Sequence, residues 1–127
     1  MATSGSKKIY IKSGAYIYLL FSWSAGTPNI ANNYTPINWN LKIVSEGHGA
    51  NIQSTASKDY SVTVDGQTWK GTNTIGIAAG ASKTLASGTK NVYHNADGSK
   101  TFSYSFSQEI AILVNGVTKI NKLNFQK

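Results

Sequence analysis

The sequence predicts an all-β protein, an antiparallel sandwich of two sheets formed by residues 1–127 as a single domain. Three observations support this prediction. The chain has 127 residues, a length that suits one domain with a real core. Short runs of alternating apolar and polar residues recur between clusters of Gly, Ser, Thr and Asn, at intervals of about ten residues. Signals for helices are almost missing.

The first part of the chain divides into strands and polar loops. We expect the opening strands at Lys8–Lys12 and Tyr16–Ser24. The stretches TPNIANNYTP and EGHGANIQSTAS, rich in polar and small residues, are predicted loops. Between them the run INWNLKIV alternates. Its predicted buried face consists of Ile37, Trp39, Leu41 and Ile43.

The segment YSVTVDGQTWKG is typical of a β-hairpin. Asp65-Gly66 is a strong signal for a two-residue turn. Such a turn places Val64 opposite Gln67 and Val62 opposite Trp69. The predicted buried face then holds Tyr60, Val62, Val64 and Trp69.

The second part of the chain is harder to divide, because IGIAAGASKTLASGTK is rich in Gly, Ser and Ala. We expect a loop there, with one short strand at Lys83–Ala86. Lys100–Ser107 is predicted to be a strand with Phe102, Tyr104 and Phe106 on one face. The last segment, EIAILVNGVTKINK, is predicted to be a hairpin with its turn at Asn115-Gly116.

The stretch NVYHNADGSKTF permits two interpretations, a calcium loop or a turn. Asn95, Asp97 and Ser99 alternate as oxygen ligands do in calcium loops. Such loops also need a later bidentate carboxylate, and the next acidic residue is Glu109, beyond an intact strand. A type I turn followed by Gly98 in a left-handed conformation explains the same residues without a metal.

This turn predicts a hairpin between the segments on either side. Its register pairs Asn95 with Ser99, and His94 with Lys100. It also pairs Val92 with Phe102, so that both face the core. We therefore expect no metal site, and we expect His94 at the end of a sheet, half-exposed.

The sequence contains few residues in arrangements that are typical of catalytic sites. His48 lies in a glycine-flanked loop with only Glu46 nearby, and the chain has five acidic residues in all. No nucleophile motif, phosphate-binding loop or pair of carboxylates occurs. We expect that the protein is not an enzyme and needs no cofactor.

The charge and cysteine content narrow the possible partners. The formal net charge is +7, carried by twelve lysines without any arginine. Because the lysines are scattered and arginine is absent, we expect no nucleic-acid partner, whereas polyanionic teichoic acid stays possible. The chain has no cysteine, and its longest apolar run, Tyr16–Phe21, is too short to cross a membrane. The N-terminus MATSGSKKIY lacks the pattern of a signal peptide.

Three segments, NIANNYTPINWNLKI, YSVTVDGQTWKG and VYHNADGSKTFSYSF, occur in an order that resembles one known family. This is the β-sandwich domain of siphophage minor structural and tail-associated virion proteins, mostly from phages of low-GC Gram-positive bacteria. HNADGSKT is the most specific part, and the resemblance covers Tyr16–Phe106. The family usually carries this unit inside longer chains, whereas this sequence starts at its own Met1. The last segment, Glu109–Lys127, has no counterpart.

The resemblance implies an immunoglobulin- or fibronectin-like sandwich and a component of a phage tail, baseplate or capsid surface. It implies no ligand, since the family offers no set of binding residues to transfer.

The strand Tyr16–Trp23 is apolar on both faces, which is unusual in a two-layer sandwich. Its inner face is predicted to hold Ile17, Leu19, Phe21 and Trp23. Tyr16, Tyr18 and Leu20 are on the other face. Either these three form an exposed patch that seats a partner protein or another copy, or the N-terminal strand or last hairpin covers them. Tyr93 is a further outward candidate, able to stack on a sugar ring.

Two classes of function follow from these expectations. The first is a virion structural or accessory protein, such as a decoration, tail or baseplate subunit, located on the particle surface and contributing to host adhesion. Its partners would be other virion proteins or further copies of itself. The second is a host-recognition module that binds cell-wall glycan or teichoic acid. The length of the chain favours the first class and its positive charge favours the second.

Overall fold

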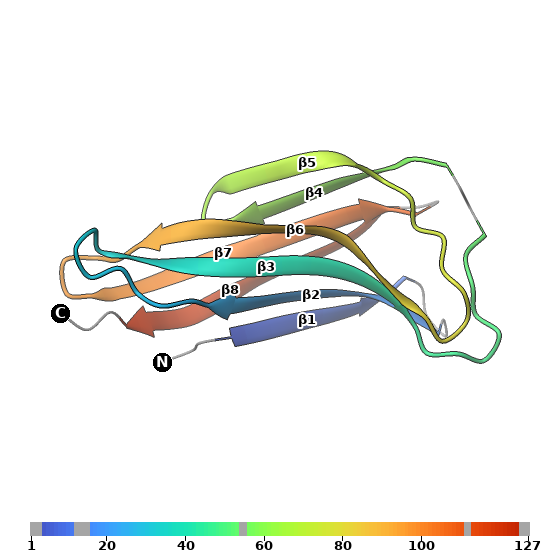
Figure 1. Cartoon of the computed structure of the whole chain (residues 1–127), viewed down its shortest axis with the longest axis horizontal. Helices are drawn as coiled ribbons and strands as arrows, with labels where there is room; N and C mark the ends of the chain where they lie inside the picture. Colours follow the sequence, from blue (N-terminus) through green and yellow to red (C-terminus); the bar gives the residue numbers. More distant parts are fainter. Residues whose placement is uncertain (1–3, 12–15, 54–55, 111–112, 125–127) are drawn as a thin grey trace.

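The computed structural model is a sandwich of two antiparallel sheets with four strands each, as the sequence predicts (Figure 1). It describes residues 4–11, 16–53, 56–110 and 113–124, and these contain no helix. The first sheet has the order β1-β2-β3-β6 and the second β5-β4-β7-β8. The strands are β1 (Ser4–Tyr10), β2 (Ile17–Ala25), β3 (Tyr34–Ser45), β4 (Lys58–Val64), β5 (Gln67–Asn73), β6 (Ser82–Tyr93), β7 (Ser99–Glu109) and β8 (Leu113–Asn124).

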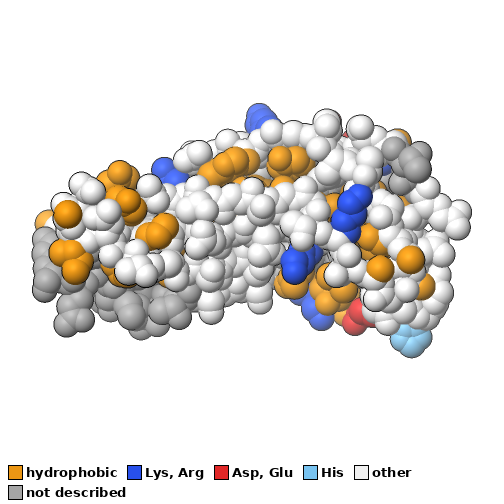
Figure 2. All heavy atoms as spheres, in the orientation of Figure 1, with side chains coloured by type: hydrophobic (Ala, Val, Ile, Leu, Met, Phe, Trp, Pro, Cys, Tyr) orange, Lys and Arg blue, Asp and Glu red, His pale blue; other side chains and the backbone are white. Residues whose placement is uncertain are grey.

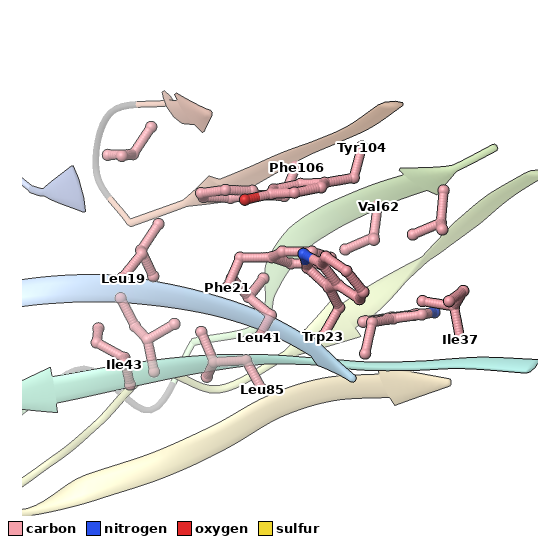
Figure 3. Packing of buried hydrophobic residues seen from close by; sticks show 14 of the residues in the cluster. Leu19, Phe21, Trp23, Ile37, Leu41, Ile43, Val62, Leu85, Tyr104 and Phe106 are labelled. Atoms are coloured by element: carbon pink, nitrogen blue, oxygen red, sulfur yellow. The ribbon is translucent and has the colours of Figure 1, made fainter. Parts of the chain in front are cut away.

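The core lies between the sheets and follows the predicted alternation. The buried positions of β2 and β3 are Ile17, Leu19, Phe21, Trp23, Ile37, Trp39, Leu41 and Ile43. From the opposite sheet, β7 contributes Phe102, Tyr104 and Phe106, which are also buried. The Phe21 ring stacks on Tyr104 and Phe106, with ring centroids 4.4 Å and 5.4 Å apart (Figure 3). Aromatic stacking across the layers therefore joins the two sheets.

The Asp65-Gly66 hairpin forms as predicted and joins β4 to β5. Val64 pairs with Gln67 and Val62 with Trp69. Asp65 and Gly66 have φ angles of 47° and 84°, the two positive values that a type I′ hairpin turn requires. The predicted buried face is confirmed for the two valines, whereas Tyr60 and Trp69 are only partly buried against the core.

The strand β6 is much longer than predicted. Where the sequence predicted a loop with a short strand at Lys83–Ala86, twelve residues form a strand along β3. Gly88 of β6 lies directly opposite Trp39, and a Cβ at Gly88 would be 2.9 Å from Trp39 Nε1. The small residue is thus required by the neighbouring indole. Because β6 is rich in small residues, it lacks the apolar alternation by which strands are recognised in a sequence.

The predicted hairpin turn at Asn115-Gly116 is wrong. Both residues lie inside β8, which pairs with β7 along its length. Gly116 is opposite Phe106, and the Phe106 ring together with Ile9 occupies the space that a Cβ would take. The glycine therefore makes room for an aromatic ring instead of turning the chain.

The predicted turn after β6 is confirmed in its local conformation. Gly98 has a φ of 83°, and its N–H donates to the Asn95 carbonyl oxygen at 2.9 Å. The Asn95 N–H donates to the Ser99 carbonyl oxygen at 2.8 Å. The left-handed position thus falls on the glycine, as expected.

The hairpin expected on either side of this turn does not form. β6 belongs to the first sheet and β7 to the second, so the turn carries the chain across the sandwich. The predicted pairs His94–Lys100 and Val92–Phe102 are therefore wrong. Val92 and Phe102 are both buried, but they reach the core from opposite sheets.

Candidate functional site

The outer face of the first sheet carries the predicted site residues. Directly paired residues of antiparallel strands share a face, so the register defines which side chains lie together. One row across the sheet consists of Tyr10, Tyr18, Val44 and Ser82, and the next of Lys8, Leu20, Lys42 and Thr84. β1 extends the sheet beside β2 (Figure 1). Among the described strands, none lies over this face, so the alternative in which the N-terminal strand covers it does not hold.

A cluster of aromatic and charged side chains occupies one end of this face. We call it the tyrosine cluster, and it consists of Tyr10, Tyr16, Tyr18, Leu20, Lys8, Glu46 and His48. Tyr10 and Tyr18 meet edge to face, with ring centroids 5.5 Å apart. The Lys8 ammonium lies 4.3 Å from the centroid of the Tyr18 ring, within the range of a cation–π contact.

The loop after β3 brings His48 onto Tyr16. Their rings stack with centroids 4.3 Å apart. His48 has a φ of 58°, a left-handed conformation that histidine adopts more readily than most residues. The buried Ser45 hydroxyl holds this loop, because it donates to the Ala50 carbonyl oxygen at 2.6 Å and accepts from the Gly80 N–H at 3.1 Å.

Charges within the tyrosine cluster are partly matched. A hydrogen bond with the Glu46 carboxylate raises the pKa of the Tyr10 hydroxyl above its ordinary value of 10.0. Lys8 and Lys42 flank Leu20 on the neighbouring strands. The centre of the patch is apolar and aromatic, and the positive charges of the two lysines lie beside it.

The structure brings three of the four predicted site residues together and separates the fourth. Tyr16 is 47% exposed, and Tyr18 and Leu20 are half-buried beside it in the same patch. Tyr93 is 57% exposed, as expected, but it lies at the opposite end of the face, where its ring is 5.4 Å from that of Tyr34. Figure 2 shows hydrophobic side chains gathered toward the two ends of this face, with polar side chains between them.

Sequence reasoning did not find Tyr10, Tyr34 or His48 as members of this face. Tyr10 could have been found from the register of a β1–β2 hairpin, which pairs it with Tyr18. Tyr34 lies inside the predicted loop TPNIANNYTP but begins β3, and it meets Tyr93 because β6 extends far enough to place that residue opposite it. No sequence signal places His48 on a tyrosine.

His94 is buried, contrary to the expected half-exposed position. Its Nδ1 lies 2.9 Å from the Gly98 carbonyl oxygen, which can only accept, so Nδ1 carries the proton. Its Nε2 lies 2.6 Å from the buried Thr35 hydroxyl. The imidazole thus ties the turn between the sheets to the beginning of β3.

The NIANN and HNADGSKT segments of the sequence meet at this point. Asn33, with a φ of 61°, donates through Nδ2 to the His94 carbonyl oxygen at 2.9 Å. The His94 N–H donates in return to the Asn33 carbonyl oxygen at 3.0 Å. On the other side of the turn, the Asp97 carboxylate accepts from the Ser99 N–H and hydroxyl at 2.9 Å and 2.6 Å. These polar residues hold the loops together.

Within the described ranges, no group of three or more His, Asp or Glu residues is placed to hold a metal ion. The same ranges contain no helix long and apolar enough to span a membrane. No protein-family model matches the chain, and neither a curated protein nor a solved structure matches it at a significant level.

Proposed function

We propose that this chain is a structural or accessory subunit of a bacteriophage virion, on the capsid surface, tail or baseplate, and that it attaches to the particle through the tyrosine cluster. The virion assignment is supported by the resemblance of its NIANN, VDG and HNADGSKT segments to siphophage structural proteins. The attachment surface is supported by one observation above all. Aromatic and apolar side chains gather on a sheet face that no described strand covers.

The chemistry of the cluster suits a protein partner. Tyrosine is enriched in the centres of protein interfaces, because a rigid ring buries a large apolar area while its hydroxyl keeps a hydrogen bond. Tyr16 and Tyr18 supply such rings, and the contacts with His48 and Lys8 hold them in place before binding. Ordering these rings in advance lowers the entropic cost of association. The partner is another virion protein or a second copy of this chain.

We further propose a role without catalysis. The buried His94 is engaged at both ring nitrogens, and His48 is stacked on Tyr16. The Asp97 carboxylate is bonded to Ser99, and Asp65 pairs with Lys100 at 3.7 Å. The titratable groups of these residues therefore already have structural partners.

The attachment is tested with a phage whose own copy of the chain is deleted and complemented by tagged variants. Leu20→Glu and Tyr18→Glu are expected to reduce incorporation into purified particles at least tenfold, because an unpaired charge in the centre of an apolar interface commonly costs about 2 kcal/mol or more. Thr63→Glu is the matched control, since Thr63 lies on the outer face of the second sheet.

The melting temperatures of the isolated variants separate a binding defect from a folding defect. Normal incorporation of the folded Leu20→Glu protein, or equal loss with Thr63→Glu, would contradict attachment through the tyrosine cluster.

A second candidate function is recognition of the host surface. The Tyr34–Tyr93 pair at the other end of the same face, in which Tyr93 is exposed, favours it, because this pair is distant from the tyrosine cluster along the sheet. Either function can hold without the other.

A further inference from the structure

The centre of the outer face is a band of small and amide side chains. By register, one row consists of Ser6, Ser22, Asn40 and Ser87, and the next of Ser4, Ser24, Asn38 and Thr89. A hollow of about 410 Å³ lies over this band, lined by residues of β1, β2 and β3. None of the eight side chains carries a charge, although the chain as a whole has a formal net charge of +7.

Hydrogen bonds orient the two amides in the band. The Ser22 hydroxyl donates to Asn40 Oδ1 at 2.9 Å, and the Thr89 hydroxyl donates to Asn38 Oδ1 at 2.8 Å. Both bonds use the amide oxygen. Within the described part of the chain, neither amide nitrogen donates to another protein group, so each asparagine keeps its N–H donors for a ligand.

An aromatic pair continues the band toward the end of the sheet. Tyr34 and Tyr93 are directly opposite each other on the same face, and Asn29 Nδ2 donates to the Tyr34 hydroxyl at 3.1 Å. Asn40 lies six positions after Tyr34 in β3, which corresponds to about 20 Å along an extended strand. One further row of β3 and β6 residues lies between the hollow and the rings on the same face, and together they form a strip longer than a single sugar ring.

We propose that this strip binds a neutral oligosaccharide. A sugar ring offers hydroxyl groups that both donate and accept, and Ser22, Asn38 and Asn40 present complementary donors and acceptors in the hollow. It also offers an apolar face of C–H groups, which suits the exposed ring of Tyr93. The proposal deepens the second candidate function, names its ligand class, and does not depend on attachment to a virion.

The distribution of charge selects a neutral ligand over a polyanion such as teichoic acid. The charged side chains of the outer face, Lys8, Lys42 and Glu46, belong to the other end of the sheet. A polyanion would be attracted to lysines, and its binding would fall steeply with salt. Binding through hydroxyls, amides and rings is expected to persist at moderate salt.

The test is a glycan array that carries neutral hexose and N-acetylhexosamine oligosaccharides beside phosphorylated and sulfated ones. The folded protein is expected to bind neutral oligosaccharides and to retain them at about 0.5 M salt, a concentration at which contacts between exposed charges are largely screened. Asn38→Ala and Tyr93→Ala should each weaken the affinity for the best neutral glycan about tenfold or more. Ser105→Ala, on the outer face of the second sheet, is the matched control and should bind normally.

Three further measurements make the result decisive. Amide chemical shifts on titration with the best neutral glycan should change along β2, β3 and β6 at the strip, while the Leu20→Glu protein should keep its glycan binding. Asn38→Ala and Tyr93→Ala should enter particles normally, which separates this proposal from the attachment function. Absence of binding to every neutral glycan, preference for the anionic ones, or unchanged binding by both variants would overturn the proposal.

Discussion

Two dipeptides with the same local turn signal adopt different structures in this molecule, one a hairpin turn and the other part of a strand. Asp65-Gly66 and Asn115-Gly116 are both strong signals for a hairpin turn. The first turns the chain between β4 and β5, with both residues at positive φ. The second lies inside β8, paired with β7. The signal shows that a turn is permitted at both positions, but the surroundings decide whether it forms.

The two glycines are needed for different physical reasons. Gly66 adopts a φ of 84° and has no heavy atom near the site of a missing Cβ, so its backbone conformation is what requires glycine. At Gly116 the neighbouring Phe106 ring occupies the place of a Cβ, so the residue must lack a side chain. Gly88 opposite Trp39 and Gly5 opposite Trp23 repeat the second case. Large rings on one strand are thus accommodated by glycines on the next.

The largest effect is expected for Gly116→Ala. In an ordinary strand this change is mildly stabilising, but here the new methyl group collides with the Phe106 ring and Ile9. We expect a loss of about 2–3 kcal/mol in the free energy of unfolding, as for overpacked cores. Urea denaturation followed by tryptophan fluorescence measures it.

The double variant Gly116→Ala with Phe106→Leu is the control for this explanation. Because the smaller side chain makes room for the methyl group, the two losses should be less than additive by about 1 kcal/mol. A Gly116→Ala protein as stable as the wild type would show that the ring does not occupy this space.

An intermediate effect is expected for the two turn glycines. Gly66→Ala and Gly98→Ala should each cost about 1 kcal/mol, because alanine is strained at φ angles of 84° and 83°. The loss of stability should be larger for Gly98→Ala, because Gly98 is buried and its carbonyl oxygen accepts a hydrogen bond from His94. Thermal unfolding of both variants gives the comparison.

Calcium offers a check on the turn at Gly98. The Asp97 carboxylate already accepts two hydrogen bonds from Ser99, so the melting temperature should be the same with calcium and with a chelator. A rise of several degrees with calcium would favour the metal interpretation of this segment instead.

The smallest effect is expected for Asp65→Asn. Asparagine also tolerates the left-handed conformation and keeps the turn, while the change removes the ion pair with Lys100, whose atoms are 3.7 Å apart. Since both side chains are partly exposed, the loss should stay below about 0.5 kcal/mol and should shrink with salt. Melting curves at low and high salt test this, and a loss above about 1 kcal/mol would assign the turn's stability to the ion pair.

Much of the site followed from strand parity alone. Alternation along Tyr16–Trp23 placed Tyr16, Tyr18 and Leu20 on the outer face. Alternation at the end of β6 placed Tyr93 outward, between two buried neighbours. The remaining members needed contacts between strands distant in sequence, as when β6 places Tyr93 opposite Tyr34. Such contacts leave no local pattern from which they could be predicted.

The sequence by itself determined the fold class, the buried faces of β2, β3 and β7, and the conformations of the turns at Gly66 and Gly98. These depend on side-chain alternation and on backbone φ, which are properties of a few consecutive residues. Only the tertiary structure decided that the chain crosses between sheets after β6, and that Gly88 and Gly116 lie in strands. The physical reason is that the pairing and packing partners of these residues come from segments remote in sequence. The local sequence around a glycine that makes room for a ring does not differ from that around a glycine that turns the chain.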